Sequence, residues 1–142
     1  MKILVSACLL GANCKYNGGN NLCPAVLNLQ QRHTLIPACP EQLGGLSTPR
    51  PPAERYGERV VTCEGTDVTE PYAKGAREAV TLAKRLGAEC AILKARSPAC
   101  GCGAIYDGTF THTVVSGRGV AAEAMEEAGI PVYTEENLPK EL

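Results

Sequence analysis

The sequence predicts a single α/β domain over residues 1–142, a three-layer α/β/α sandwich of Rossmann-like type. Two observations support this fold class. Short apolar runs rich in Ile, Leu and Val alternate with segments of helical periodicity, which is the order typical of parallel sheets. The chain of 142 residues is also long enough for one hydrophobic core and too short for two comfortable ones. We therefore expect a mainly parallel sheet of about four strands with helices on both faces.

The first predicted unit is a strand, a helix and a second strand. Lys2–Ser6 is a continuous apolar run, typical of a central strand that is buried on both faces. A glycine-rich loop follows, and Asn20 or Asn21 is expected to cap a helix that ends near Arg32. Thr34–Ala38 is the next strand. This order predicts parallel pairing of the two strands with a right-handed crossover.

A long irregular segment follows the second strand. The prolines and glycines of Cys39–Gly57 exclude a long helix or a central strand there. A loop of this length inside a compact domain is usually functional or disordered, and its varied composition favours function. Arg59–Glu64 is expected to form a small strand of a hairpin at the edge of the fold.

The clearest predicted helix lies in the middle of the chain. Asp67 and Glu70 have the spacing of a capping box, with Asp67 as the N-cap. Apolar residues then recur on one helical stripe as far as Leu86, and Gly87 is the expected C-cap. Cys90–Lys94 is the next predicted strand.

The last third of the chain completes the alternation. Gly103–Thr113 is predicted to be a loop or a hairpin that turns at Asp107-Gly108. Gly119–Ala128 is a second amphipathic helix, stopped by Gly129. Pro131–Thr134 is expected to form a final short strand.

The composition argues against several kinds of partner. A formal net charge of −1 gives no electrostatic basis for binding a nucleic acid polymer or an anionic membrane. One Phe, five Tyr and no Trp leave few aromatic faces on which bases could stack. No stretch approaches the ~20 apolar residues of a membrane span. We therefore expect neither nucleic acid polymers nor membranes as partners.

The chain has eight cysteines, a high number for its length. The residues up to Cys8 imitate a lipoprotein cleavage site, but the apolar segment before it is shorter than the ~7–15 residues of an export signal. We expect a cytoplasmic, reducing location. In that environment, clustered cysteines are more often metal ligands or reactive thiols than disulfides.

Three cysteines follow predicted strands. Cys8 and Cys39 come after the first and second strands, and Cys100 lies in a tight loop after the strand that begins at Cys90. Because the carboxyl ends of parallel strands meet at one edge of a sheet, we expect these thiols to converge. Thiolates select zinc, copper or iron–sulfur clusters. Three thiolates without an evident fourth are typical of a metal or cluster with an open position.

Several alternatives remain open at this stage. Structural zinc usually takes four ligands in paired spacing, whereas the chain has no C-x-x-C. The cysteines could also be buried as small apolar residues. A non-catalytic sulfide or metal carrier could use the same thiolates, and Cys100 with Cys102 could form the pair of a thiol-redox protein. Cys14 is a candidate extra ligand, which would close the site.

The motifs resemble those of the thiouracil desulfidase family, an iron–sulfur-dependent family that was long known only as a domain of unknown function. The resemblance covers nearly the whole chain. Its matching segments are Ser6-Ala7-Cys8-Leu9-Leu10-Gly11, Cys14-Lys15-Tyr16-Asn17-Gly18, Cys39-Pro40-Glu41, Gly44-Gly45-Leu46-Ser47-Thr48-Pro49-Arg50, Glu54, Asp67-Val68-Thr69, Gly75-Ala76, Ile92-Leu93-Lys94, Ser97-Pro98, Cys100-Gly101, Tyr106-Asp107-Gly108-Thr109-Phe110 and Gly117.

The resemblance implies a cofactor and an activity. Cys8, Cys39 and Cys100 would hold a 4Fe-4S cluster through three irons, and the fourth iron would have no protein ligand. Glu41 and Ser97 would be catalytic groups beside the cluster. The enzyme would remove sulfur from a thiolated pyrimidine such as thiouracil, giving uracil and sulfide without net redox change.

The chemistry of these residues agrees with that activity. An open iron is a Lewis acid that pulls on a thiocarbonyl sulfur. Glu41 stands two residues after Cys39, close enough to activate a water molecule as a general base. Ser97 is expected to donate a hydrogen bond to the substrate or to relay a proton.

Substrate recognition needs fixed donors and acceptors along the pyrimidine edge. We expect Ser6 and the backbone at Gly44, Gly45 and Gly101 to supply them for a thiolated base or nucleoside. Lys15 stands where the family usually has Arg, which bears on substrate preference and leaves the proposed ligands unchanged.

Overall fold

The computed structural model describes residues 1–142 and is built on one four-stranded sheet. Its strands are β1 (Lys2–Ser6), β2 (Thr34–Ala38), β5 (Cys90–Leu93) and β8 (Val132–Thr134), in the spatial order β2-β1-β5-β8. All neighbouring strands pair in parallel. The predicted α/β fold with four main strands is therefore confirmed, and β1 and β2 have the bounds that the sequence predicts.

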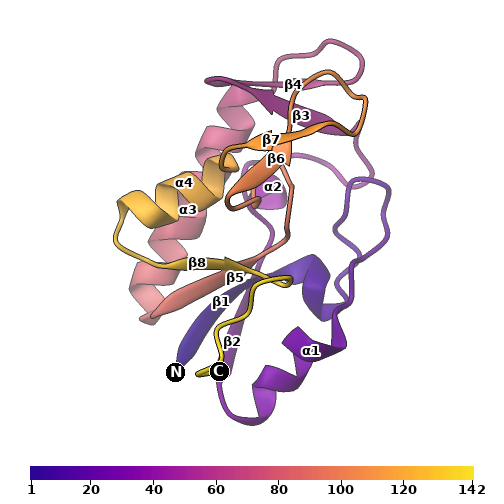
Figure 1. Cartoon of the computed structure of the whole chain (residues 1–142). Helices are drawn as coiled ribbons and strands as arrows, with labels where there is room; N and C mark the ends of the chain where they lie inside the picture. Colours follow the sequence, from indigo (N-terminus) through magenta and orange to yellow (C-terminus); the bar gives the residue numbers. More distant parts are fainter.

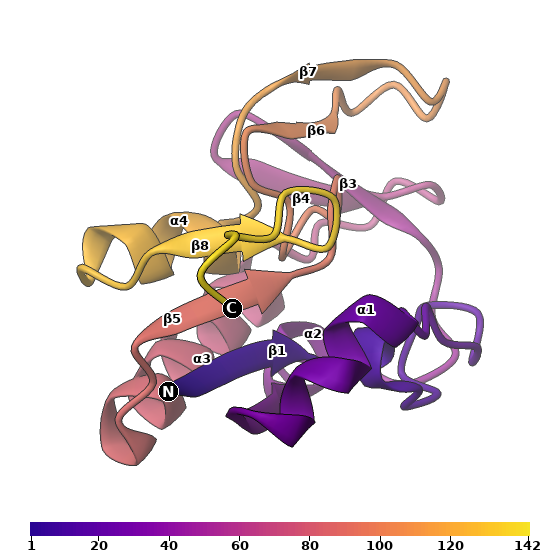
Figure 2. The same cartoon turned by 60° about the horizontal axis from the view of Figure 1, so that its bottom comes forward.

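Helices cover both faces of this sheet (Figure 1). The long helix α3 (Thr69–Leu86) and α4 (Val120–Glu127) lie side by side on one face. The short helix α1 (Pro24–Leu27) and the 3₁₀ helix η2 (Asn28–Gln31) lie on the other, as Figure 2 shows from a second side.

The alternation of side chains along β1 divides the core in two. Leu4 packs with Tyr72, Ala79 and Met125 of the α3 and α4 layer. Its neighbours Ile3 and Val5 point to the opposite face, where they pack with Val26 and Leu29. Burying each aliphatic side chain stabilises the fold by about 1.5–3 kcal/mol. The central strand is therefore stabilised by the helical layers on both of its faces.

The predicted ends of α3 are correct at one terminus and only partly correct at the other. Gly87 adopts a left-handed conformation at φ 73° and ends the helix as expected. At the start, Val68 and not Asp67 occupies the N-cap position, and no side chain caps the helix. Asp67 instead accepts a hydrogen bond from the Thr69 N–H at 2.9 Å. A capping box would use the N–H of the next residue, Glu70.

The helix before β2 begins later than predicted. Neither Asn20 nor Asn21 is its cap; Cys23 precedes the first helical residue, and Pro24 occupies the N1 position. Asn21 instead turns its amide toward the Cys8 Sγ, at 3.5 Å. The helical segment is also split into α and 3₁₀ turns before it ends at Gln31.

The long segment Cys39–Gly57 contains more structure than predicted. It holds the one-turn helix α2 (Pro40–Leu43) and the strand β3 (Ala53–Tyr56), which pairs antiparallel with β4 (Arg59–Thr62) as the expected hairpin. A second hairpin, β6 (Ala104–Tyr106) with β7 (Val114–Ser116), lies near it above the sheet (Figure 1).

Glu54 joins the two hairpins. Its Oε1 accepts hydrogen bonds from the N–H groups of Gly108 and Phe110, at 3.0 and 3.1 Å. Both hairpins therefore stand as one unit over the carboxyl ends of the strands.

Helix α2 rests on α3 through two glycines. A Cβ at Gly44 would overlap the carbonyl of Pro71, and a Cβ at Gly75 would overlap the carbonyl of Pro40. Neither glycine has a positive φ, so close backbone approach and not conformational freedom requires them. The contact fixes α2, and with it Glu41, against the long helix.

The helices of the structure include none with both the length and the apolar character needed to cross a bilayer.

Replacing Gly75 by Ala tests the contact between α2 and α3. Alanine is intrinsically favoured in a helix interior, but here its methyl group would overlap the Pro40 carbonyl. We therefore expect the free energy of unfolding to fall by about 1–3 kcal/mol. Urea denaturation of Gly75→Ala measures this loss. The matched control is Lys74→Ala on the exposed side of the same helix, expected to stay within about 0.5 kcal/mol of the wild type. Equal stability of the two variants would contradict the contact.

Candidate functional site

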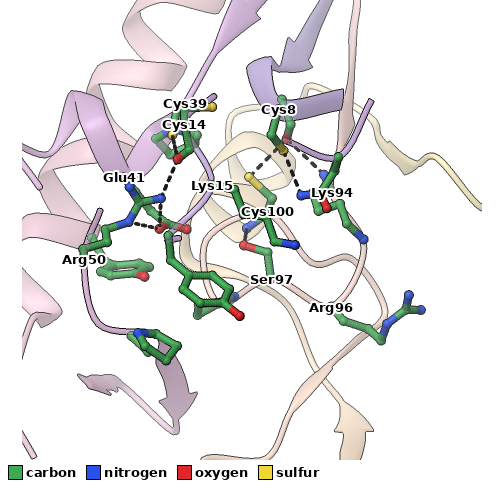
Figure 3. Close-up of a pocket in the computed structure, with 18 of the residues that line it drawn as sticks. Cys8, Cys14, Lys15, Cys39, Glu41, Arg50, Lys94, Arg96, Ser97 and Cys100 are labelled. Carbon is green, nitrogen blue, oxygen red and sulfur yellow. Dashed lines mark hydrogen bonds and ion pairs between the residues drawn. The ribbon is translucent and has the colours of Figure 1, made fainter. Parts of the chain in front are cut away.

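A cavity of about 390 Å³ opens at the carboxyl edge of the sheet, and Cys8, Cys39 and Cys100 all line it. Figure 3 shows their side chains around this cavity together with Glu41 and Ser97. The three thiols come from parts of the chain that are far apart in sequence. The predicted convergence of the strand-end cysteines is therefore present in the structure.

Strand geometry delivers each thiol. The chain leaves β1 at Ser6 and enters the 3₁₀ helix η1 (Ala7–Leu10), which carries Cys8. Cys39 follows β2 directly and has extended backbone before α2 begins at Pro40. Cys100 lies farther beyond its strand, in a turn that follows Arg96, whose φ of 64° turns the chain sharply.

Hydrogen bonds hold two of the sulfurs. The buried Ser6 hydroxyl donates to Cys100 Sγ at 3.2 Å and accepts the Lys94 N–H at 3.0 Å. The Asn21 side-chain amide donates to Cys8 Sγ at 3.5 Å. Donors aimed at sulfur stabilise the thiolate form, which is the form that binds metal.

The thiols influence one another electrostatically. Burial raises the pKa of Cys8, and the neighbouring Cys39 raises it further, while the Asn21 hydrogen bond lowers it. Burial also raises the pKa of Cys100; the Ser6 hydrogen bond opposes this shift, and Glu41 and Cys8 add to it. Ionising these groups together would gather like charges in a poorly hydrated cavity, which is unfavourable unless a cationic centre binds them.

This donor set fits an iron–sulfur cluster better than a single ion. No three His, Cys, Asp or Glu side chains are grouped so that they could hold one metal ion. A four-iron cluster takes each cysteine on a different iron, so its ligands stand farther apart than the ligands of one ion. Three thiols spread around one cavity match that requirement.

Glu41 lies in the first turn of α2 and lines the same cavity. Its Oε2 is paired with Arg50, whose Nε donates at 2.7 Å and whose Nη2 lies at 2.6 Å. The pair is largely buried, with side-chain exposure of 15% for Glu41 and 7% for Arg50. Burial, followed by the charge of Glu41, raises the pKa of Tyr72, which therefore stays protonated next to this carboxylate.

Ser97 shapes the turn that carries Cys100. Its Oγ accepts hydrogen bonds from the N–H groups of Ala99 and Cys100, both at 3.1 Å. The hydroxyl also lines the cavity. Because its lone pairs face two backbone donors, the Ser97 hydroxyl is left as a donor toward the cavity.

Two cationic residues of the site were present in the sequence motifs without a predicted role. One is Arg50. The other is Lys94, whose Nζ lies 2.7 Å from Glu135 Oε2 while it lines the cavity. Their charge partners lie at sequence separations that no local pattern covers. Only the motif positions themselves could have drawn attention to them.

Cys14 and Cys102 occupy different environments. Cys14 is 4% exposed and lines the cavity, and burial with the nearby Cys39 raises its pKa to about 12. Cys102 does not line it; its Sγ lies 3.8 Å from Glu126 Oε1 and 3.7 Å from the Val132 carbonyl oxygen. Every cysteine is a free thiol. Cys14 therefore accompanies the three strand-end thiols, and Cys102 stands apart.

The predicted substrate-binding residues are only partly brought to the cavity. Ser6 lines it, but the residue is only 2% exposed and its hydroxyl is hydrogen-bonded to Cys100 Sγ and to the Lys94 N–H. Gly44, Gly45 and Gly101 do not line it. Gly44 serves the close contact with α3 instead, and a Cβ at Gly101 would meet Ile105 and the Ser97 carbonyl.

Known proteins match this chain along nearly its whole length. The family model described as 2-thiouracil desulfurase matches residues 3–137. The uncharacterized protein YbbK of Bacillus subtilis (strain 168) is 42% identical over 146 residues, covering 96% of this chain and 97% of that protein. The solved structure of the [4Fe-4S]-dependent thiouracil desulfidase TudS is 42% identical, with a TM-score of 0.92, covering 98% of this chain and 93% of that one. On the match of fold and sequence along nearly its whole length, the chain belongs to the 2-thiouracil desulfurase family of enzymes.

Proposed function

We propose that residues 1–142 form a single-domain desulfidase that converts a thiolated pyrimidine such as thiouracil, with water, to uracil and hydrogen sulfide. The observation that carries this proposal is the shared cavity of Cys8, Cys39 and Cys100 with Glu41 and Ser97. The likeness to a solved [4Fe-4S]-dependent thiouracil desulfidase supports it. The oxygen of the product comes from water and the sulfur leaves as sulfide, so no electrons are gained or lost.

Cys8, Cys39 and Cys100 would hold the 4Fe-4S cluster, and Cys14 stays free in this proposal. A cluster held by three cysteines supplies one iron as a Lewis acid toward the substrate sulfur. Ser6 supports this arrangement from behind, because its hydroxyl already points at Cys100 Sγ. The sequence suggested that Ser6 contacts substrate; we propose instead that it orients the cluster ligand Cys100.

Glu41 is the proposed general base. Its carboxylate lines the cavity and is held through one oxygen, Oε2, by Arg50. A water molecule beside the carboxylate would give up a proton as its oxygen adds to the thiocarbonyl carbon. The same group can return a proton to the leaving sulfur.

Ser97 is the proposed hydrogen-bond donor. Its oxygen accepts from Ala99 and Cys100, which fixes the direction of its own proton toward the cavity. A fixed donor orients the pyrimidine so that its sulfur faces the cysteine wall, the side of the cavity formed by Cys8, Cys39 and Cys100. A role of Ser97 as a base is disfavoured by the same contacts.

The other candidate functions differ in what they require. A sulfide or metal carrier would use the three thiols but would not need Glu41 near them. A thiol-redox pair of Cys100 and Cys102 is disfavoured, because Cys100 bonds to Ser6 and Cys102 lies near Glu126. We further propose a cytoplasmic location, where the thiols remain reduced.

Iron content tests the ligand assignment. Protein purified without oxygen is expected to be brown and to hold roughly four irons per chain. Cys8→Ser, Cys39→Ser and Cys100→Ser should each lower that content severalfold. Cys102→Ser and Cys63→Ser should not. A colourless wild type after anaerobic reconstitution would contradict the assignment.

Sulfide release tests catalysis separately from cluster binding. Glu41→Gln keeps the size of the side chain and removes the base, so we expect the rate of sulfide release from thiouracil to fall about 10²- to 10⁴-fold. Ser97→Ala should reduce it less, by about 10-fold. Iron content should stay at the wild-type level in both. An unchanged rate in Glu41→Gln would contradict the role of Glu41 as the base, whereas a wild type that holds its irons and releases no sulfide would favour a carrier.

A further inference from the structure

Arg50 is the buried cation of the site, and each nitrogen of its guanidinium group has a protein partner. Nε and Nη2 face Glu41, Nη2 also donates to the Cys14 carbonyl at 2.9 Å, and Nη1 donates to the Ser47 carbonyl at 3.2 Å and Thr48 Oγ1 at 3.0 Å. Its own backbone N–H donates to the Tyr16 carbonyl at 2.8 Å. Figure 3 shows the side chain lying between Glu41 and Cys14.

These contacts tie two other segments to the loop that carries Arg50. Glu41 belongs to α2, Cys14 and Tyr16 belong to the loop after η1, and Ser47 and Thr48 belong to the loop before β3. The Cys14 carbonyl that Arg50 holds also lies 3.9 Å from Cys39 Sγ. Arg50 therefore sets the distance between the proposed base and the wall that carries the thiols.

Arg50 engages only one oxygen of Glu41. Both nitrogen contacts converge on Oε2, so Oε1 lies outside the ion pair. A carboxylate clamped through one oxygen has a fixed direction for the other. That geometry suits a base that must meet a water molecule at a defined place.

We infer that Arg50 is a positioning residue for the desulfidation reaction, which directs Glu41 and binds the Cys14 loop to it. The inference rests on the proposed function. Lysine cannot replace Arg50, because a single ammonium lacks the planar fork that reaches Glu41, Cys14 and the Ser47 loop together. A merely structural ion pair would change stability and leave the turnover of the folded, loaded enzyme intact.

The test compares Arg50→Lys and Arg50→Ala with the wild type in sulfide release from thiouracil, iron content and thermal midpoint. We expect kcat of Arg50→Lys to fall about 10- to 100-fold with KM little changed, while iron content stays at the wild-type level. Millimolar guanidinium should restore part of the kcat of Arg50→Ala. The matched control is Arg59→Lys, since Arg59 pairs with Asp67 on the surface at 2.7 Å and should keep wild-type kcat.

The outcomes separate this inference from the proposed function. A wild type that holds its irons and releases no sulfide would overturn both. An active wild type with equally active Arg50→Lys would overturn only the role of Arg50. A loss of kcat that merely follows a loss of iron, with no rescue of Arg50→Ala by guanidinium, would show a structural role and would also overturn it.

Discussion

The site depends on one constraint, the level ending of three parallel strands. β1 pairs with β2 up to Ser6 opposite Ala38, and with β5 up to Val5 opposite Ile92. The chain leaves all three strands at the same edge of the sheet. The thiols that follow the strands therefore lie near one another even without direct contacts between them. The helices on both faces bury the strands, and the two hairpins joined by Glu54 roof the edge.

Charge is balanced unevenly within that frame. The cavity is lined by thiols whose pKa values are raised, by the Glu41 carboxylate and by the cations Lys15, Arg50, Lys94 and Arg96. Arg50, Lys94 and Arg96 are each paired with a carboxylate, whereas Lys15 lies over the Tyr16 ring. Iron bound by Cys8, Cys39 and Cys100, as proposed, would compensate the negative charge of their thiolates. The cysteine wall and the fixed carboxylate then face each other across one cavity, an arrangement that a carrier would not need.

Periodicity and turn chemistry predicted most of the frame. The apolar runs gave the bounds of β1 and β2, and Gly87 marked the end of α3, because these features depend on local sequence. The predicted start of α1 was wrong, because the helix begins at Pro24 after Cys23. Asn21 instead donates a hydrogen bond to Cys8 Sγ, a tertiary contact that local sequence does not reveal. The convergence of Cys8, Cys39 and Cys100 could be predicted, because each follows a strand and the carboxyl ends of parallel strands meet at one edge. The contacts of Arg50 and Ser6 could not be predicted, since their partners are brought to them by the fold. Gly44 was predicted to bind substrate, but in the structure it allows the close approach of α2 to α3.

The most direct test of the central claim is iron-edge anomalous diffraction from crystals of the anaerobically reconstituted protein. The account predicts four iron positions in the cavity, three of them bonded to Cys8, Cys39 and Cys100 and one without a protein ligand on the side of Glu41 and Ser97. A fourth iron bonded to Cys14, or iron located away from these three thiols, would contradict it.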